Sequence, residues 1–162
     1  MDFELSLFNQ DWMLEKAVEE VLQNNEVSAD YGLSLTQQQA AALVETRSRV
    51  LNKTGRIEFG GGIIDKLIAA FCDSPYITKE NYEETLHDLL ELFYEYKNET
   101  HDLIGDDELI QFMRVSFNGI CHGALALLSD RELVRLVREL RFGSGATDME
   151  NTDEEETENE TD

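Results

Sequence analysis

The sequence predicts an all-α protein, a compact bundle of five or six helices followed by a disordered acidic C-terminal tail. Apolar residues recur at intervals of three and four along most of the chain, as expected for helices with one buried face. Residues that favour helix starts and stops separate these stretches. Sustained alternation of apolar and polar residues is confined to the short piece 3–8. These observations favour helices over strands throughout residues 1–143.

The first helix is expected to begin at Asn9. As the N-cap, Asn9 would let Phe8 pack on Met13 in a hydrophobic staple. The helix should end at Asn24-Asn25. Four residues share its predicted buried stripe: Leu14, Val18, Val21 and Leu22.

The second and third helices have clear start and stop signals in the sequence. Residues 36–39, Thr-Gln-Gln-Gln, predict a capping box, and Gly55 predicts the end of the second helix. The third helix should follow Gly60–Gly62 and end at Ser74-Pro75. The apolar faces of the two helices are Leu43, Val44, Val50 and Leu51, then Ile64, Leu67, Ile68 and Phe71.

The fourth helix is expected to start at a Thr78 cap, and the fifth at the acidic residues 106–108, where the helix dipole favours carboxylates. The fifth helix should continue through Gly119 and Gly123. The predicted inward-facing residues are Tyr82, Leu86, Leu89, Leu90, Phe93 and Tyr96, then Ile110, Met113, Phe117, Ile120, Cys121, Ala124 and Leu128.

A second capping box, residues 129–132, is expected to open the last helix, and Gly143 to close it. Its inward-facing residues would be Leu133, Leu136, Val137 and Leu140. Residues 144–162 contain nine acidic residues, no basic residue and one large apolar side chain. Such a segment buries too little apolar surface to offset the entropy of ordering, so we expect disorder. The sequence thus divides into a helical domain, 1–143, and a disordered acidic tail, 144–162.

The charge of the chain restricts its partners. With 13 Lys and Arg against 35 Asp and Glu, the net charge is -22, of which -13 lies on residues 1–143. Phosphate and anionic lipid attract clustered basic residues, so the composition excludes nucleic acid and membrane as easy partners. The N-terminus lacks the pattern of a secretory signal, and apolar runs are too short to cross a bilayer. We expect a cytoplasmic protein whose two cysteines, Cys72 and Cys121, are reduced and buried.

Residues 31–141 also resemble a known family. The most distinctive pieces are GRIEFGGGIIDKL, at 55–67, and CDSPYI, at 72–77. On these pieces the chain is similar to an uncharacterised family of short, acidic bacterial proteins, classified only as a domain of unknown function. The resemblance implies a bacterial cytoplasmic protein and brings no catalytic residues to transfer.

Candidate chemistry is sparse. Gly60–Gly62 before a helix could expose N–H groups to an anion, but a turn with positive φ or close helix packing is the favoured interpretation. Glu84-x-x-His87 occurs once, whereas di-iron bundles use the pair twice. His87, Cys121 and His122 could form a metal-dependent or hydrolytic site if the fold brought them together. The sequence supports no catalytic, cofactor or metal residue more firmly than this.

The last helix carries the one concentrated basic surface. Arg131, Arg135 and Arg138 follow i, i+4, i+7 spacing and are the candidate interaction surface. Pairing with Glu132 and Glu139 is the simpler interpretation. Gly119 and Gly123, four residues apart on the predicted fifth helix, indicate close helix packing or, alternatively, a homodimer seam.

The leading hypothesis is a non-enzymatic interaction or regulatory module that acts through a protein partner of unknown identity. The first alternative is the small enzyme with a site near His87, Cys121 and His122. The second is an acidic nucleic-acid mimic that occupies a DNA-binding partner, a hypothesis that rests on charge alone.

Overall fold

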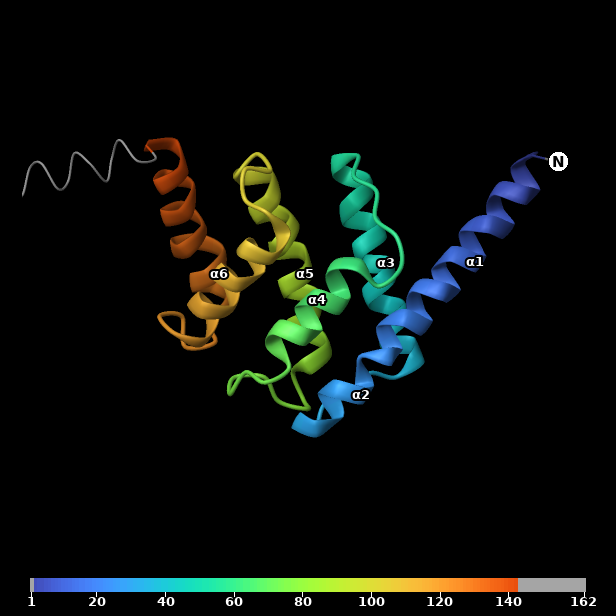
Figure 1. Ribbon diagram of the computed structural model, residues 1–162, viewed down its shortest axis with the longest axis horizontal. Coiled ribbons are helices and arrows are strands. Elements are labelled where there is room, and N and C mark those ends of the chain that lie inside the picture. Colours follow the sequence, from blue (N-terminus) through green and yellow to red (C-terminus); the bar gives the residue numbers. More distant parts are fainter. Residues whose placement is uncertain (1, 143–162) are drawn as a thin grey trace, which may run out of the picture.

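The computed structural model describes residues 2–142, with side chains described from Trp12 onward, and every regular element in this range is helical (Figure 1). This confirms the all-α prediction. The predicted tail 144–162 and the predicted stop at Gly143 lie outside the described residues. The elements are α1 (Asp2–Gln23), α2 (Asn25–Ser28), η1 (Ala29–Tyr31), α3 (Gln37–Thr54), α4 (Gly62–Phe71), α5 (Tyr82–Glu99), α6 (Asp106–Asn118), α7 (Leu125–Leu127) and η2 (Leu128–Glu132), followed by a last helix at residues 133–142.

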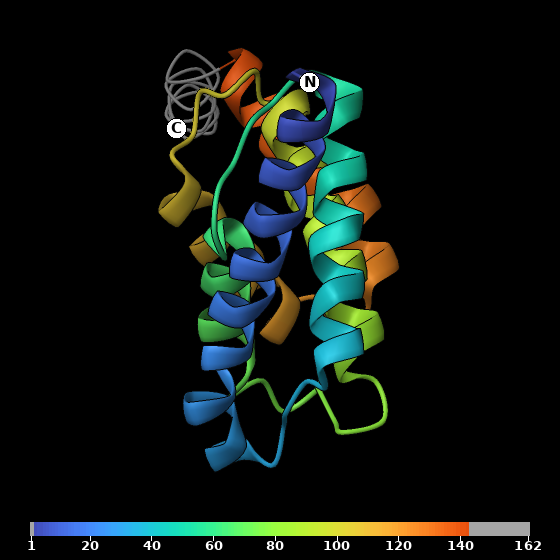
Figure 2. The ribbon, with the colours of Figure 1, turned by 90° about the vertical axis from the view of Figure 1, so that its right-hand side faces the viewer.

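The helices form two layers. α1, α4 and α6 lie in one layer, and α3, α5 and the last helix lie in the other (Figures 1 and 2). The long helices therefore alternate between layers along the chain. α5 is central and contacts α3, α4 and α6. α1 and the last helix form the two ends of the arrangement.

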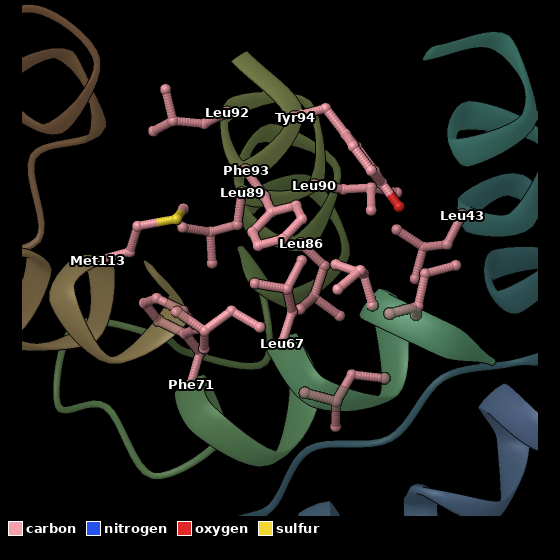
Figure 3. Close-up of a cluster of buried hydrophobic side chains, with 14 of the residues drawn as sticks. Leu43, Leu67, Phe71, Leu86, Leu89, Leu90, Leu92, Phe93, Tyr94 and Met113 are labelled. Atoms are coloured by element: carbon pink, nitrogen blue, oxygen red, sulfur yellow. The ribbon is translucent and has the colours of Figure 1, made fainter. Parts of the chain in front are cut away.

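The apolar core fills the space between the layers. Figure 3 shows Leu67 and Phe71 of α4 pointing toward Leu89 and Phe93 of α5, with Met113 of α6 beside them. All of these side chains are buried. The rings of Phe71 and Phe117 meet edge to face with centroids 5.5 Å apart. Burial of these aliphatic and aromatic faces is the main stabilising contribution to the fold.

Several predicted boundaries are confirmed. The capping box of α3 is complete, because the Gln39 N–H donates to Thr36 Oγ1 at 3.1 Å and the Thr36 N–H donates to Gln39 Oε1 at 2.9 Å. Gly55 ends α3 with a φ of 68°. α6 starts at Asp106, with its acidic residues in the first turn.

Two predicted helix starts are wrong. α1 begins at Asp2 and runs through Asn9, so Asn9 caps no helix. A single Asn inside a helix costs less than about 1 kcal/mol, too little to end one whose neighbours continue it. α5 begins at Tyr82 instead of following a Thr78 cap. The Thr78 N–H donates to Asn81 Oδ1 at 2.8 Å, which makes residues 78–81 a turn with Asn81 at the N-cap position.

The predicted continuation of α6 through its glycines is also wrong. α6 ends at Asn118, and residues 119–124 form a loop. The loop caps the helix, because the Cys121 N–H donates to the Ser116 carbonyl at 2.9 Å and the Gly123 N–H to the Phe117 carbonyl at 2.8 Å. Gly119 and Gly123 therefore share no helical face, so their four-residue spacing supports neither the close helix packing expected there nor the alternative homodimer seam.

The last helix starts earlier than its predicted capping box. α7, η2 and residues 133–142 are continuous in the chain, and η2 is a π-helical turn. Ser129 Oγ donates to the Ala126 carbonyl at 3.1 Å instead of capping a helix. The buried Tyr96 hydroxyl donates to the Leu128 carbonyl at 2.6 Å, and such an inserted donor is a common cause of a widened turn.

Candidate functional site

A cluster of polar side chains surrounds the start of α4. We call it the α4 cluster, and its members come from α1, the turn between α1 and α2, α3, the segment before α4, α4 itself and α5: Glu20, Asn24, Arg47, Glu58, Asp65 and Tyr94. Three carboxylates and one guanidinium thus meet at one place. Buried or half-buried charges need partners, and each of these has one.

The glycine run Gly60–Gly62 binds carboxylates of the protein itself. The Gly61 N–H donates to Glu20 Oε2 at 2.7 Å, and the Ile63 N–H donates to Glu58 Oε1 at 2.5 Å. Gly60 has a φ of 62°, a conformation that favours glycine, and a Cβ there would lie 2.1 Å from Glu20 Oε2, so the Glu20 side chain would have to shift. The positive φ values of Gly60 and Gly62, 62° and 49°, agree with the favoured interpretation of the run as a turn, and the N–H groups at the start of α4 are occupied by Glu20 and Glu58.

Arg47 links α3 to this segment. Its side chain is only 4% exposed, and its Nη1 lies 3.3 Å from Glu58 Oε1 and 3.0 Å from the Gly61 carbonyl. Its Nε is buried without a hydrogen-bond partner. The Tyr94 hydroxyl donates to Glu58 Oε2. Figure 3 shows the Tyr94 oxygen at the margin of the apolar core.

Burial and neighbouring charges raise the pKa of two members of the cluster, Asp65 and Tyr94. Burial raises the pKa of Asp65, and the neighbouring Glu20 and Glu58 raise it further. A hydrogen bond from Asn24 Nδ2 to Asp65 Oδ1, at 2.6 Å, opposes this shift. Burial also raises the pKa of the Tyr94 hydroxyl, which therefore stays a donor to Glu58. The start of α4 carries more carboxylate than guanidinium, and a basic ligand would relieve that excess.

A groove opens beside the α4 cluster. We call it the α1–α3 groove; its volume is about 720 Å³, within the usual range for ligand sites. Glu20, Arg47 and Glu58 line it. Its apolar and aromatic lining side chains Trp12, Met13, Leu14 and Phe59 are 56%, 41%, 43% and 67% exposed. Exposed apolar side chains gathered in one place are typical of interaction sites.

The histidines and cysteines of the predicted enzyme site have separate surroundings. His87 Nδ1 lies 2.9 Å from Thr46 Oγ1, and its Nε2 lies 3.3 Å from Glu83 Oε2. His122 is exposed in the 119–124 loop, with Nδ1 3.3 Å from the Tyr76 hydroxyl. Within residues 12–142, no three His, Cys, Asp or Glu side chains are grouped so that they could hold a metal ion.

Both cysteines are buried and unpaired with each other, at 4% exposure for Cys72 and 1% for Cys121. Burial raises the pKa of each thiol, and neighbouring carboxylates add to the shift. A raised thiol pKa disfavours the thiolate, the reactive form in nucleophilic catalysis.

The three predicted interaction arginines are divided between two places. Arg135 donates to Glu132 at 2.8 Å and to Glu139 at 3.0 Å, and its guanidinium lies 5.4 Å from the Phe112 ring centroid. Arg131 Nε lies 3.7 Å from Glu132 Oε2. Arg138 lines a different groove, beside α5. Glu132 and Glu139 thus both pair with Arg135.

A family of unknown function, DUF6323, matches residues 20–146. The chain belongs to the DUF6323 family. The match begins at Glu20 and includes every residue of the α4 cluster, so the cluster lies wholly inside the DUF6323 region. No curated protein and no solved structure matches the chain. In the part of the chain that the structure describes, no helix is long and apolar enough to cross a membrane.

Sequence reasoning identified Gly60–Gly62 but missed the side chains around it. One signal was available: Arg47 lies four residues after Leu43 and four before Leu51, on the apolar face of α3. A charged residue in a core position needs a buried partner. Which partner it finds depends on tertiary structure, since Glu58 and Tyr94 come from other segments.

Proposed function

We propose that this protein is a non-enzymatic interaction module that binds an apolar, basic segment of a partner protein in the α1–α3 groove. The observation that carries the proposal is the concentration of exposed Trp12, Met13, Leu14 and Phe59 around a groove. These apolar side chains favour an apolar anchor, and the net charge of -22 on the chain favours a basic neighbour. Within the groove itself, Glu20 and Glu58 are matched by Lys16 and Arg47.

The charge of the whole chain supports the same class of partner. A net charge of -22 favours the approach of basic proteins over acidic ones, most strongly at low salt. Lys16 lies 5.2 Å from the Trp12 ring centroid, an internal example of a cation on this aromatic rim. Glu20 and Glu58 of the α4 cluster accept hydrogen bonds from backbone N–H groups of the protein itself, so they hold the start of α4 in place.

Trp12 allows a direct test, because it is the only tryptophan in the chain. The probe is a synthetic leucine–lysine peptide with helical periodicity. We expect a saturable blue shift of Trp12 emission as the groove is filled. A leucine–glutamate peptide should not bind, and a lysine–serine peptide of equal charge should leave the emission unchanged.

Two variants locate the binding. Phe59→Asp should weaken binding of the leucine–lysine peptide, whereas Val115→Asp, at a 59% exposed position of α6, should not. Equal weakening by both variants, or no saturable shift in the wild-type protein, would overturn the proposal.

A further inference from the structure

One face of the last helix is largely exposed, and only Val137 on it is partly buried against the core. Val134, Val137, Arg138, Arg141 and Phe142 follow i, i+3, i+4, i+7, i+8 spacing, so they share a helical face. Val134 and Phe142 are 56% and 62% exposed. This face lines a groove of about 450 Å³ at the end of the molecule opposite α1, and we call it the α5–C groove.

The opposite wall of the α5–C groove is acidic. Glu95 and Glu99 lie one turn apart on α5, and Asp130 of η2 lies beside them. Burial raises the pKa of Glu95, and repulsion from Glu99 and Asp130 adds to the shift. Within residues 12–142, no ion pair joins these acids to Arg138 or Arg141. The groove therefore presents unpaired charges of both signs next to exposed apolar side chains.

A surface with both signs of charge is complementary to itself. In a twofold dimer, each contact between two different residues occurs twice, with the roles of the copies exchanged. Two opposite charges on one patch can then pair across the twofold axis, whereas a purely acidic or basic patch would repel its own copy.

We propose that the α5–C groove is the interface of a homodimer, in which Arg138 and Arg141 of each copy face Glu95 and Glu99 of the other. Val134, Val137 and Phe142 supply the apolar part of the interface. Two chains of net charge -22 repel each other, and at physiological salt a Debye length of about 8 Å limits this repulsion to the charges near the interface. The dimer uses the opposite end of the molecule from the α1–α3 groove and does not depend on the proposed partner.

The test is the molar mass of the full chain by sedimentation equilibrium across a concentration series. We expect a monomer–dimer equilibrium for the wild type. Val134→Glu should shift it to monomer, because the variant places a charge on the apolar face. Val115→Glu, a matched exposed valine on α6, should leave it unchanged. Circular dichroism is the control that checks whether both variants fold.

Charge exchange tests the pairing itself. The double variant E95R/E99R has a wholly basic groove apart from Asp130, and the double variant R138E/R141E has an acidic one. Each alone should be monomeric, and an equimolar mixture should form a heterodimer. A wild-type chain that stays monomeric, a Val134→Glu dimer as tight as wild type, or a mixture that does not associate would overturn the proposal. A dimer that forms only after residues 143–162 are removed would also overturn it, since the tail would then be the occupant.

Discussion

Glu20 of α1 accepts a hydrogen bond from the backbone N–H of Gly61, 41 residues further along the chain, at 2.7 Å. This contact attaches the first helix to the start of α4. It also provides a negative charge where the helix dipole of α4 is positive. Asn24, the residue directly after α1, donates a hydrogen bond to Asp65 on α4 and reinforces the same junction.

Glu20→Ala is expected to destabilise the protein by about 1–2 kcal/mol, since it leaves the Gly61 N–H without its acceptor. The matched control is Glu19→Ala, because Glu19 is exposed on the same helix and should contribute little. Urea unfolding of both variants measures the difference. Equal stability losses would show that the Glu20–Gly61 contact contributes nothing of its own.

Arg47→Met should be the most damaging substitution in the α4 cluster. It removes the guanidinium but leaves the Glu58 carboxylate, only 18% exposed, without its counter-charge. Breaking a buried ion pair from one side costs about 3–5 kcal/mol. Arg49→Met, two residues away, breaks an exposed pair with Glu91 and should cost less than about 1 kcal/mol. Thermal unfolding compares the two, and similar melting temperatures would contradict the prediction.

Gly123→Ala should destabilise the 119–124 loop. Gly123 has a φ of 78°, and an added Cβ would lie 2.5 Å from Tyr76 Cβ. The strain alone costs about 1–3 kcal/mol, before the clash is relieved. Gly105→Ala is the control, because Gly105 has a φ of -62° and open space around its Cα. Because Gly105 is the N-cap of α6, where alanine is less favourable than glycine, that variant should cost about 1 kcal/mol or less. Urea unfolding measures both, and an unaffected Gly123 variant would contradict the described loop.

Glu132→Gln should change how stability depends on pH. The hydrogen bond from Arg135 holds the pKa of Glu132 below its ordinary 4.5 in the folded protein. Its stabilising contribution is therefore present above pH 4.5 and is lost as the pH falls from 4.5 through the folded-state pKa. Urea unfolding across this range should show a difference in the free energy of unfolding between wild type and variant that decreases as the pH falls. Glu139→Gln, at the exposed partner of the same arginine, should show little gap at any pH.

The sequence predicted much of the fold because its helix signals are local. The capping box at Thr36 and the stop at Gly55 involve residues within one turn of each other, and both are confirmed. Local signals gave the wrong helix start where a residue distant in sequence binds the capping group instead. Ser129 and Glu132 have the spacing of a capping box, but the Glu132 carboxylate accepts hydrogen bonds from Ser116 and Arg135. The Tyr96 hydroxyl also donates to the Leu128 carbonyl.

The α4 cluster could not be predicted from local sequence patterns either, because its contacts join residues far apart in the sequence. Glu20 and Arg47 lie on different helices, and only the packing of α1 and α3 against the segment 55–61 brings them together. Glycines at 60–62 signalled a close approach of the backbone. They did not identify what approaches, since a carboxylate of the protein and an external anion need the same N–H groups.

The π-helical turn at Leu128–Glu132 has a consequence for comparing relatives. Such a turn contains one residue more than an α-helical turn, so it absorbs that residue and leaves residues 133–142 in nearly the orientation that an unbroken α-helix would give them. Removing one residue here would leave an α-helical turn, with Leu133 and Leu136 still in the core. A one-residue gap at this place in an alignment of the family would therefore leave the buried face of the last helix unchanged, whereas the same gap later in residues 133–142 would rotate the residues after it by about 100°.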